Sequence, residues 1–177
     1  SHGVDLTYRM AEALGAKPRP VLSPGLVPDR GVRDVLLGDP HVRGTLGLAA
    51  GADVAVVGIG VPVPGSVVMQ AGILTDDQVD DLRAHGAVGD IALRFINQRG
   101  EPIDHEINDR TIALEIEQIR AIPRVIGVAA GSDKVNVIRA ALRGGILDVL
   151  VTDQSTAEAL LGPITGRNGE GTPPPVH

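Results

Sequence analysis

The sequence predicts an α/β fold in which helices cover both faces of a parallel sheet. Three short runs rich in β-branched residues, at 53–60, 125–129 and 146–151, are typical of strands buried on both faces. Segments with helical spacing of apolar residues lie between these runs. Tyr8 and Phe95 are the only aromatic residues, so the core is expected to be aliphatic, and 177 residues suit a single domain.

The first sixty residues predict three helices and two strands. An amphipathic helix over 6–14 is followed by an expected strand over 19–22, and apolar spacing predicts a second helix over 32–38. Asp39-Pro40 then provides an N-cap and a proline at the first helical position, so a third helix is expected to run to about residue 50. The apolar run at 53–60 is the second strand.

The middle of the chain begins with a strong helix signal. Thr75 and Gln78 form a capping box, which predicts a helix that runs to about residue 84. The remaining expected elements are, in chain order, a strand over 91–96, a hairpin turn at 98–100, a polar loop at 108–110 and a helix over 114–122.

After Pro123 the sequence repeats the order strand, turn, helix. The strand at 125–129 leads into the small-residue turn Ala130-Gly131-Ser132, and the helix that follows ends at Gly144-Gly145. The last strand, 146–151, is followed by a short helix capped by Thr152 or Asp153. We interpret residues 1–3 as a tag remnant, 4–162 as one domain and 163–177 as a flexible tail rich in Gly, Pro and polar residues.

The turn before the last long helix is the first candidate site. A strand, a glycine turn and a helix start together aim free backbone N–H groups at an anion. Ser132 is expected to be the N-cap, and Asp133 suits the positive end of the helix dipole. Lys134 opposes that dipole by about 0.3–1 kcal/mol. A bound phosphate or carboxylate would offset this cost, and a solvated lysine at an ordinary turn is the alternative.

Two further features belong to the same expected edge of the sheet. Gly58-Ile59-Gly60 ends a strand, and ligands of open parallel sheets bind at the carboxyl ends of strands. If the two strands are parallel, this loop and the Gly131 turn face one crevice. A tight exit turn is the alternative for Gly58 and Gly60. Asp90 lies between a glycine turn and a strand, where it either caps the turn or accepts hydrogen bonds from sugar hydroxyls.

Composition excludes several classes of function. The net charge is −6 with no run of basic residues, so nucleic acid is not expected to bind these residues directly. The chain has no cysteine, which excludes disulfides and thiolate chemistry and is compatible with the cytoplasm. No apolar run is long enough for a membrane span, and no signal peptide is visible.

No catalytic motif is present. The sequence lacks a Gly-x-Ser-x-Gly elbow, a Walker-type phosphate loop and a Gly-x-Gly-x-x-Gly motif after a strand. His41, His85 and His105 are expected in different elements without metal-ligand spacing, and 104–106 reads as a solvated loop. We therefore expect no catalytic residue, no metal and no cofactor. The remaining features suit the holding of a small phosphorylated polyol.

The sequence resembles the C-terminal effector-binding domain of the SorC family of bacterial sugar-responsive transcriptional regulators. The resemblance covers roughly residues 5–162 and rests on ordered blocks at 53–60, 86–91, 129–134, 140–145 and 150–157. It implies a Rossmann-like fold similar to those of sugar-phosphate isomerases, deaminases and CoA transferases. It also implies a phosphorylated sugar effector and a homo-oligomer, dimeric or tetrameric.

The resemblance also implies roles for individual residues. Asp90 would contact hydroxyls or a carbonyl of the effector, and Lys134 would reach the phosphate or a nearby hydroxyl. Gly58 and Gly60 would let the backbone approach, Gly131 in the turn before Lys134 is a further effector-binding candidate, and Gln70 is another implied contact. The chain lacks the helix-turn-helix of the family and its first strand with the phosphate loop, so DNA contact is expected only through a part absent here.

Two other functions remain as alternatives. An enzyme of the same fold, such as a sugar-phosphate isomerase or deaminase, would resemble those deaminases in an Asp-Gly-His motif after the strand. This sequence has Val61-Pro62-Val63-Pro64 there, with no acid or base. A purely structural assembly domain would leave the position of Lys134 without a purpose.

Overall fold

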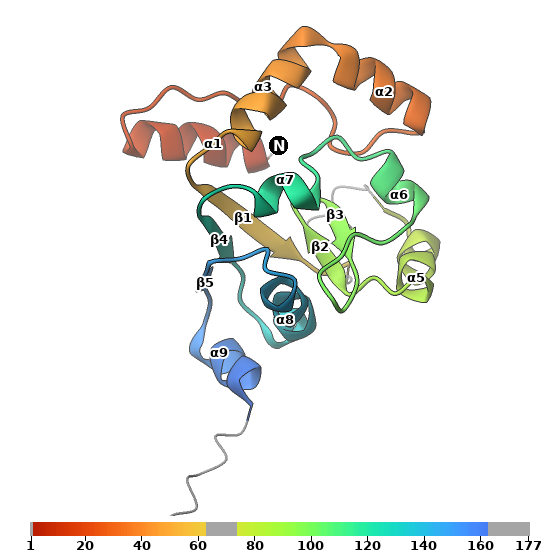
Figure 1. The fold of residues 1–177 in the computed structure, drawn as a ribbon, viewed down its shortest axis with the longest axis vertical. Coiled ribbons are helices and arrows are strands. Elements are labelled where there is room, and N and C mark those ends of the chain that lie inside the picture. Colours follow the sequence, from red (N-terminus) through yellow and green to blue (C-terminus); the bar gives the residue numbers. More distant parts are fainter. Residues whose placement is uncertain (1, 63–73, 163–177) are drawn as a thin grey trace, which may run out of the picture.

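The computed structural model describes residues 2–62 and 74–162, and the predicted tail at 163–177 lies outside these ranges. The elements in chain order are α1 (His2–Ala13), α2 (Arg30–Gly38), α3 (Pro40–Ala50), β1 (Ala55–Gly60), α5 (Asp76–Ala84), β2 (Gly89–Ile91), β3 (Arg94–Ile96), α6 (Glu106–Asp109), α7 (Ile116–Arg120), β4 (Val125–Val128), the 3-10 turn η1 (Ser132–Lys134), α8 (Val135–Arg143), β5 (Val149–Val151) and α9 (Gln154–Leu161). Helices α1 to α3 gather at one end of the molecule, and α9 lies at the other (Figure 1).

The predicted α/β class is confirmed, with a sheet that is parallel at its centre. The strand order is β3-β2-β1-β4-β5. Strands β1, β4 and β5 are parallel, whereas β2 and β3 pair in antiparallel fashion at one edge. The single strand expected over 91–96 is wrong, because Ala92 and Leu93 adopt positive φ angles of 49° and 71° and turn the chain into a hairpin.

Local sequence signals correctly predicted the starts of two helices, α3 and α5. Asp39 accepts hydrogen bonds from the N–H groups of His41 and Val42 at the start of α3. Thr75 and Gln78 form both bonds of the capping box at the start of α5. These caps depend only on residues within one turn of the chain, which is why the sequence reveals them.

Two further predicted elements are wrong. The segment 19–22 forms no strand, and the polar loop predicted at 108–110 is instead the end of α6, where Asn108 is buried. The Asn108 side chain donates to the carbonyls of Phe95 and Ile103 and accepts from the Phe95 N–H. It therefore reinforces the pairing of β3 with the returning segment, where the Ile103 N–H donates to the Phe95 carbonyl and Ile96 bridges to Pro102.

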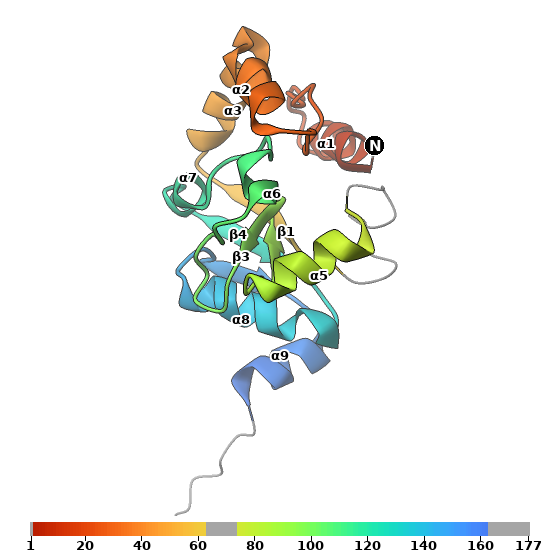
Figure 2. The ribbon, with the colours of Figure 1, turned by 90° about the vertical axis from the view of Figure 1, so that its right-hand side faces the viewer.

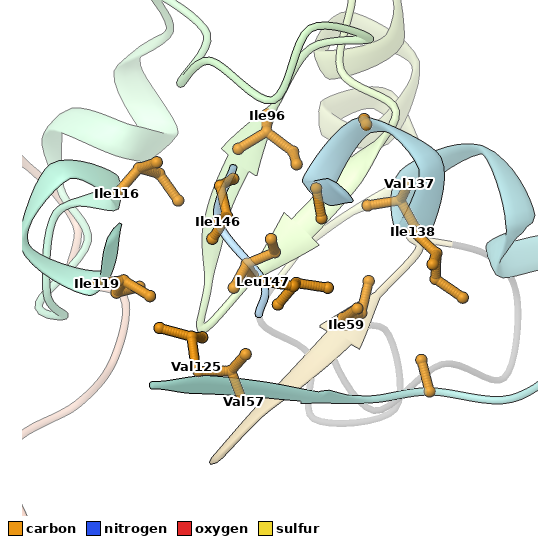
Figure 3. Packing of buried hydrophobic residues seen from close by; sticks show 14 of the residues in the cluster. Val57, Ile59, Ile96, Ile116, Ile119, Val125, Val137, Ile138, Ile146 and Leu147 are labelled. Atoms are coloured by element: carbon orange, nitrogen blue, oxygen red, sulfur yellow. The ribbon is translucent and has the colours of Figure 1, made fainter. Parts of the chain in front are cut away.

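The main core lies on one face of the central strands. Val57 and Ile59 of β1 and Val125 of β4 pack against apolar residues of α7 and α8 (Figure 3). The alternation of side chains along each strand brings these residues to one face. A second cluster, which includes Leu82 and Phe95, joins α5 to the hairpin, and Figure 2 shows α5 beside the strands.

The opposite face of β1, β4 and β5 is open in the described part of the chain. Val56, Val128 and Val151 are exposed there, although parallel strands usually have both faces covered. Helices were expected on both faces of the sheet. Among the residues that the structure describes, helices cover one face only. No described helix is long and apolar enough to cross a membrane.

Candidate functional site

The site predicted from the glycine loops lies at the carboxyl ends of β1 and β4. These strands are adjacent and parallel, and Gly58 pairs with Val128, so the two glycine loops leave the same edge of the sheet. Gly60 at the end of β1 pairs with Asp90 of β2. The structure therefore brings Gly58, Gly60 and Asp90 together with the turn that follows β4.

Asp90 has one carboxylate oxygen in use and one buried without a partner. The residue is 5% exposed. Its Oδ2 accepts a hydrogen bond of 3.1 Å from the N–H of Leu93, which holds the strained hairpin turn. Its Oδ1 is buried and has no hydrogen-bond partner among the described residues. A buried acceptor without a donor is costly, so this oxygen is suited to accept a hydroxyl of a ligand.

Burial raises the pKa of Asp90 to about 6, whereas the Leu93 N–H and the positive charge of Lys134 oppose that rise. Burial acts most strongly because it disfavours the charged carboxylate. Lys134 is thus close enough to Asp90 for its charge to act on the carboxylate. The two groups that the sequence singled out belong to one electrostatic site.

The raised pKa of Asp90 predicts a pH dependence of stability. The native state holds a proton on Asp90 that the unfolded chain releases near pH 4, so the free energy of unfolding should fall as pH rises from about 4 to about 6, by up to about 3 kcal/mol. The Asp90→Asn side chain cannot ionise, so the free energy of unfolding of this variant should not show this fall between about pH 4 and about pH 6. Urea unfolding of the ligand-free protein at several pH values measures the difference between the two proteins. A difference that stays constant over this window would contradict the raised pKa.

Gly60 leaves the space that the Asp90 carboxylate occupies. A Cβ atom at Gly60 would overlap Asp90 Oδ1 and lie 3.0 Å from its Cγ, whereas a Cβ at Gly58 meets no heavy atom within 4 Å. Gly60→Ala should therefore lower the free energy of unfolding by about 1–3 kcal/mol, and Gly58→Ala should change it by less than about 0.5 kcal/mol. Thermal unfolding of both variants tests this, and equal losses would show that the carboxylate moves aside freely.

The backbone N–H of Gly131 is not free for an anion, contrary to the sequence prediction. It donates to Asp153 Oδ2 at 2.9 Å and to Thr156 Oγ1 at 3.1 Å. Asp153 also caps α9, so the end of β5 holds the turn after β4 in place. Gly131 has a φ of 118°, a conformation that favours glycine. Its role here is to shape the turn that carries Lys134.

The start of α8 also differs from the prediction. Ser132 is not the N-cap, because 132–134 form the 3-10 turn η1 and Lys134 occupies the position before Val135 without a side-chain cap. Lys134 is half-buried and forms no salt bridge with a described residue. Its charge therefore lies at the positive end of α8 without a described carboxylate in ion-pair contact. Gln70, the remaining predicted contact, lies outside the described residues.

A second polar cluster joins α5 to the start of α6. Asp81, His85 and His105 offer ligand atoms within 4.8 Å of one another, and the two rings meet edge to face. His105 is buried, so the prediction of a solvated loop at 104–106 is wrong. His85 and His105 belong to different elements, as predicted, but the fold brings their rings together.

The hydrogen bonds of this cluster favour a structural role over metal binding. His105 Nδ1 accepts from the Ile107 N–H at 3.1 Å, so its Nε2 carries the proton that it donates to Asp81 Oδ2 at 2.9 Å. A metal ion on Nε2 would move the proton of the neutral ring to Nδ1. Nδ1 could then no longer accept the Ile107 N–H, and the cap of α6 would be lost. The cluster therefore fastens α6 to α5, and the absence of a metal remains a prediction.

Comparison with known proteins identifies the family. The family model Sugar-bind, which describes a sugar-binding domain, matches residues 1–162. The chain belongs to this family. The resemblance to SorC-type regulators is thereby confirmed, because the relatives of this Sugar-bind domain include the sorbitol operon regulator SorC and proteins named as transcriptional regulators.

Three relatives show how far the similarity extends. The erythritol catabolism regulatory protein of Brucella abortus (strain 2308) is 30% identical over 163 residues, which are 92% of this chain and 51% of that protein. The full-length sorbitol operon regulator SorC of Klebsiella pneumoniae matches with a TM-score of 0.83 and 31% identity, over 90% of this chain and 52% of that chain. A sugar-binding domain of a Vibrio fischeri transcriptional repressor matches with a TM-score of 0.82 and 34% identity, over 89% of this chain and 63% of that chain. The Sugar-bind domain thus spans about half the length of the curated relatives that it matches.

Proposed function

We propose that this Sugar-bind domain senses a phosphorylated sugar or polyol for a transcriptional regulator. The observation that carries the proposal is the buried, unpaired Oδ1 of Asp90 beside the charge of Lys134 at the carboxyl edge of the sheet. An ionised carboxylate accepts hydrogen bonds from hydroxyl groups, and an ammonium group attracts a phosphate. A polyol phosphate carries both complementary groups on one small molecule.

The names of the relatives support this class of effector. One relative regulates erythritol catabolism and another the sorbitol operon, and both names contain a polyol. Gly58, beside which no heavy atom lies within 4 Å of a Cβ position, would let such a molecule approach the backbone, whereas Gly60 makes room for the Asp90 carboxylate. Gly131 would act indirectly, by shaping the turn that carries Lys134, because its N–H is already used. Gln70 is kept in the proposal as a further contact.

The proposed domain binds its effector without transforming it. The expected partners of Asp90 and Lys134 at this edge are a hydroxyl and a phosphate, whereas Asp153, which also lies there, already accepts the Gly131 N–H. The regulator would act in the cytoplasm as a homo-oligomer, and it would contact DNA through a part of the protein outside this chain. The names of the relatives support the regulatory part of this view, because they describe regulators of a catabolic route, of an operon or of transcription.

Thermal unfolding of the intact regulator with sorbitol 6-phosphate, erythritol 4-phosphate, their unphosphorylated polyols and inorganic phosphate tests the proposal. A binding polyol phosphate at 100 times its Kd should stabilise the protein by about 2.7 kcal/mol, which raises Tm by about 5–10 °C. Shifts with the free polyols alone would reject the phosphate contact. Conversion of glucose 6-phosphate or glucosamine 6-phosphate, followed by NMR, would instead favour the isomerase or deaminase alternative.

A further inference from the structure

The open face of the central sheet forms a continuous apolar surface, which we call the valine face. The register places its residues in two rows across the strands, Val56, Ile126 and Val149 in one and Gly58, Val128 and Val151 in the other, with Val54 just before the first. The five valines are 37–53% exposed. Neither row contains a charged or polar side chain.

This composition indicates a buried surface. Strands with one face in water alternate apolar and polar residues, whereas β1 and β4 carry β-branched residues on both faces. Each Å² of apolar surface left in water costs about 25 cal/mol, and contiguous apolar patches on a protein surface generally mark a site of contact. The valine face therefore has the sequence of an interior and needs a cover.

The described helices cannot supply that cover. The chain moves across the sheet in one direction, from β1 to β4 to β5. Crossovers between parallel strands are right-handed, so successive steps in one direction put their helices on the same face. Helices α7 and α8 accordingly pack on the face of Val57 and Val125 (Figure 3).

The comparisons indicate where the cover comes from. The Vibrio fischeri structure is a sugar-binding domain alone, yet this chain covers 63% of it. About a third of that sugar-binding domain therefore lies outside the matched part. A segment of this size can hold several helices and strands, and it belongs to the same polypeptide.

We propose that the valine face is an interface within one polypeptide, covered in the intact regulator by the part of the sugar-binding domain that lies outside this chain. Residues paired directly across an antiparallel ladder share one face, and side chains alternate along a strand. Gly60 and Asp90 are such a pair, so they lie on the valine face at its carboxyl end. The covering segment consequently borders the candidate site. The proposal itself does not depend on which effector binds.

Cysteine labelling tests the proposal directly, because the chain contains no cysteine of its own. Val128→Cys places a thiol on the valine face, and Leu142→Cys places one on α8 at a similar exposure, since the two residues are 45% and 41% exposed. In the intact regulator, alkylation of the cysteine at 128 should be about 100-fold slower than at 142, as for a site that opens only by local unfolding. Both alkylation rates are corrected for the labelling measured in the unsubstituted regulator.

Three results would overturn the proposal. Equal rates at 128 and 142 in the intact regulator would show that the face stays open. Protection at 128 that appears only as protein concentration rises would show that a second copy covers it. Protection already present in the 177-residue chain at low concentration would assign the cover to residues of this chain. None of these results requires an effector, so the proposed function can fail or hold independently.

Discussion

Lys134→Ala is expected to weaken the binding of a polyol phosphate by about 1.5–3 kcal/mol, which is a loss of about 10- to 150-fold in affinity. The ammonium group lies at the positive end of α8, has no described salt-bridge partner, and acts on the pKa of Asp90. Removing it deletes a charge-assisted contact to the phosphate. The corresponding free polyol should lose much less affinity, because it has no phosphate for Lys134 to reach. Titration calorimetry on the intact regulator measures both ligands.

Lys17→Ala is the matched control for this experiment. The sequence contains only two lysines, and Lys17 is exposed in the segment after α1. Its removal changes the net charge by the same amount but should leave both affinities unchanged. An unchanged affinity in Lys134→Ala would remove that residue from the site. Equal losses for the phosphorylated and free polyols would show that Lys134 does not act through the phosphate.

Arg94→Met is expected to lower the free energy of unfolding by about 3–5 kcal/mol. The Arg94 side chain is 3% exposed, and its guanidinium group ties β3 to the segment before α7. It donates to the carbonyls of Asn108, Thr111, Ala113 and Leu114 and to the Glu115 carboxylate. Methionine fills a similar space but leaves these carbonyls without donors, and buried acceptors without partners are costly. Urea unfolding measures the loss.

Arg143→Met provides the comparison for Arg94. Arg143 is exposed near the end of α8 and forms no salt bridge with a described residue, so its replacement should cost less than about 0.5 kcal/mol. If Arg94→Met lowered the free energy of unfolding no more than Arg143→Met, water would have to reach the carbonyls that accept hydrogen bonds from Arg94. The hairpin would then depend on its apolar contacts alone.

Part of the candidate site was predictable because it rests on residues adjacent in the sequence. Gly58 and Gly60 end an apolar strand, and Lys134 follows a glycine turn at a helix start, so both could be assigned to the carboxyl edge of a sheet. The structure confirms that β1 and β4 are parallel neighbours. The roles of Asp90 and Lys134 toward an effector remain predictions.

Other features depend on partners far away in the sequence. Nothing local shows that Asp153 takes up the Gly131 N–H, or that His105 meets Asp81. Arg94 offered one signal, because it is a single charge within an apolar run, and such a charge often marks a buried network. Its five acceptors, however, are spread over 108–115 and could not be assigned from spacing.

The sequence by itself determined the elements whose causes lie within a turn or a strand: the capped starts of α3 and α5, the apolar strands β1 and β4, and the aliphatic core. The tertiary structure decided the hairpin of β2 and β3, the use of the Gly131 N–H, and the burial of one unpaired oxygen of Asp90. It also decided which face of the sheet is covered. The reason is that caps and side-chain periodicity act over a few residues, whereas burial and hydrogen-bond satisfaction depend on which distant segments meet.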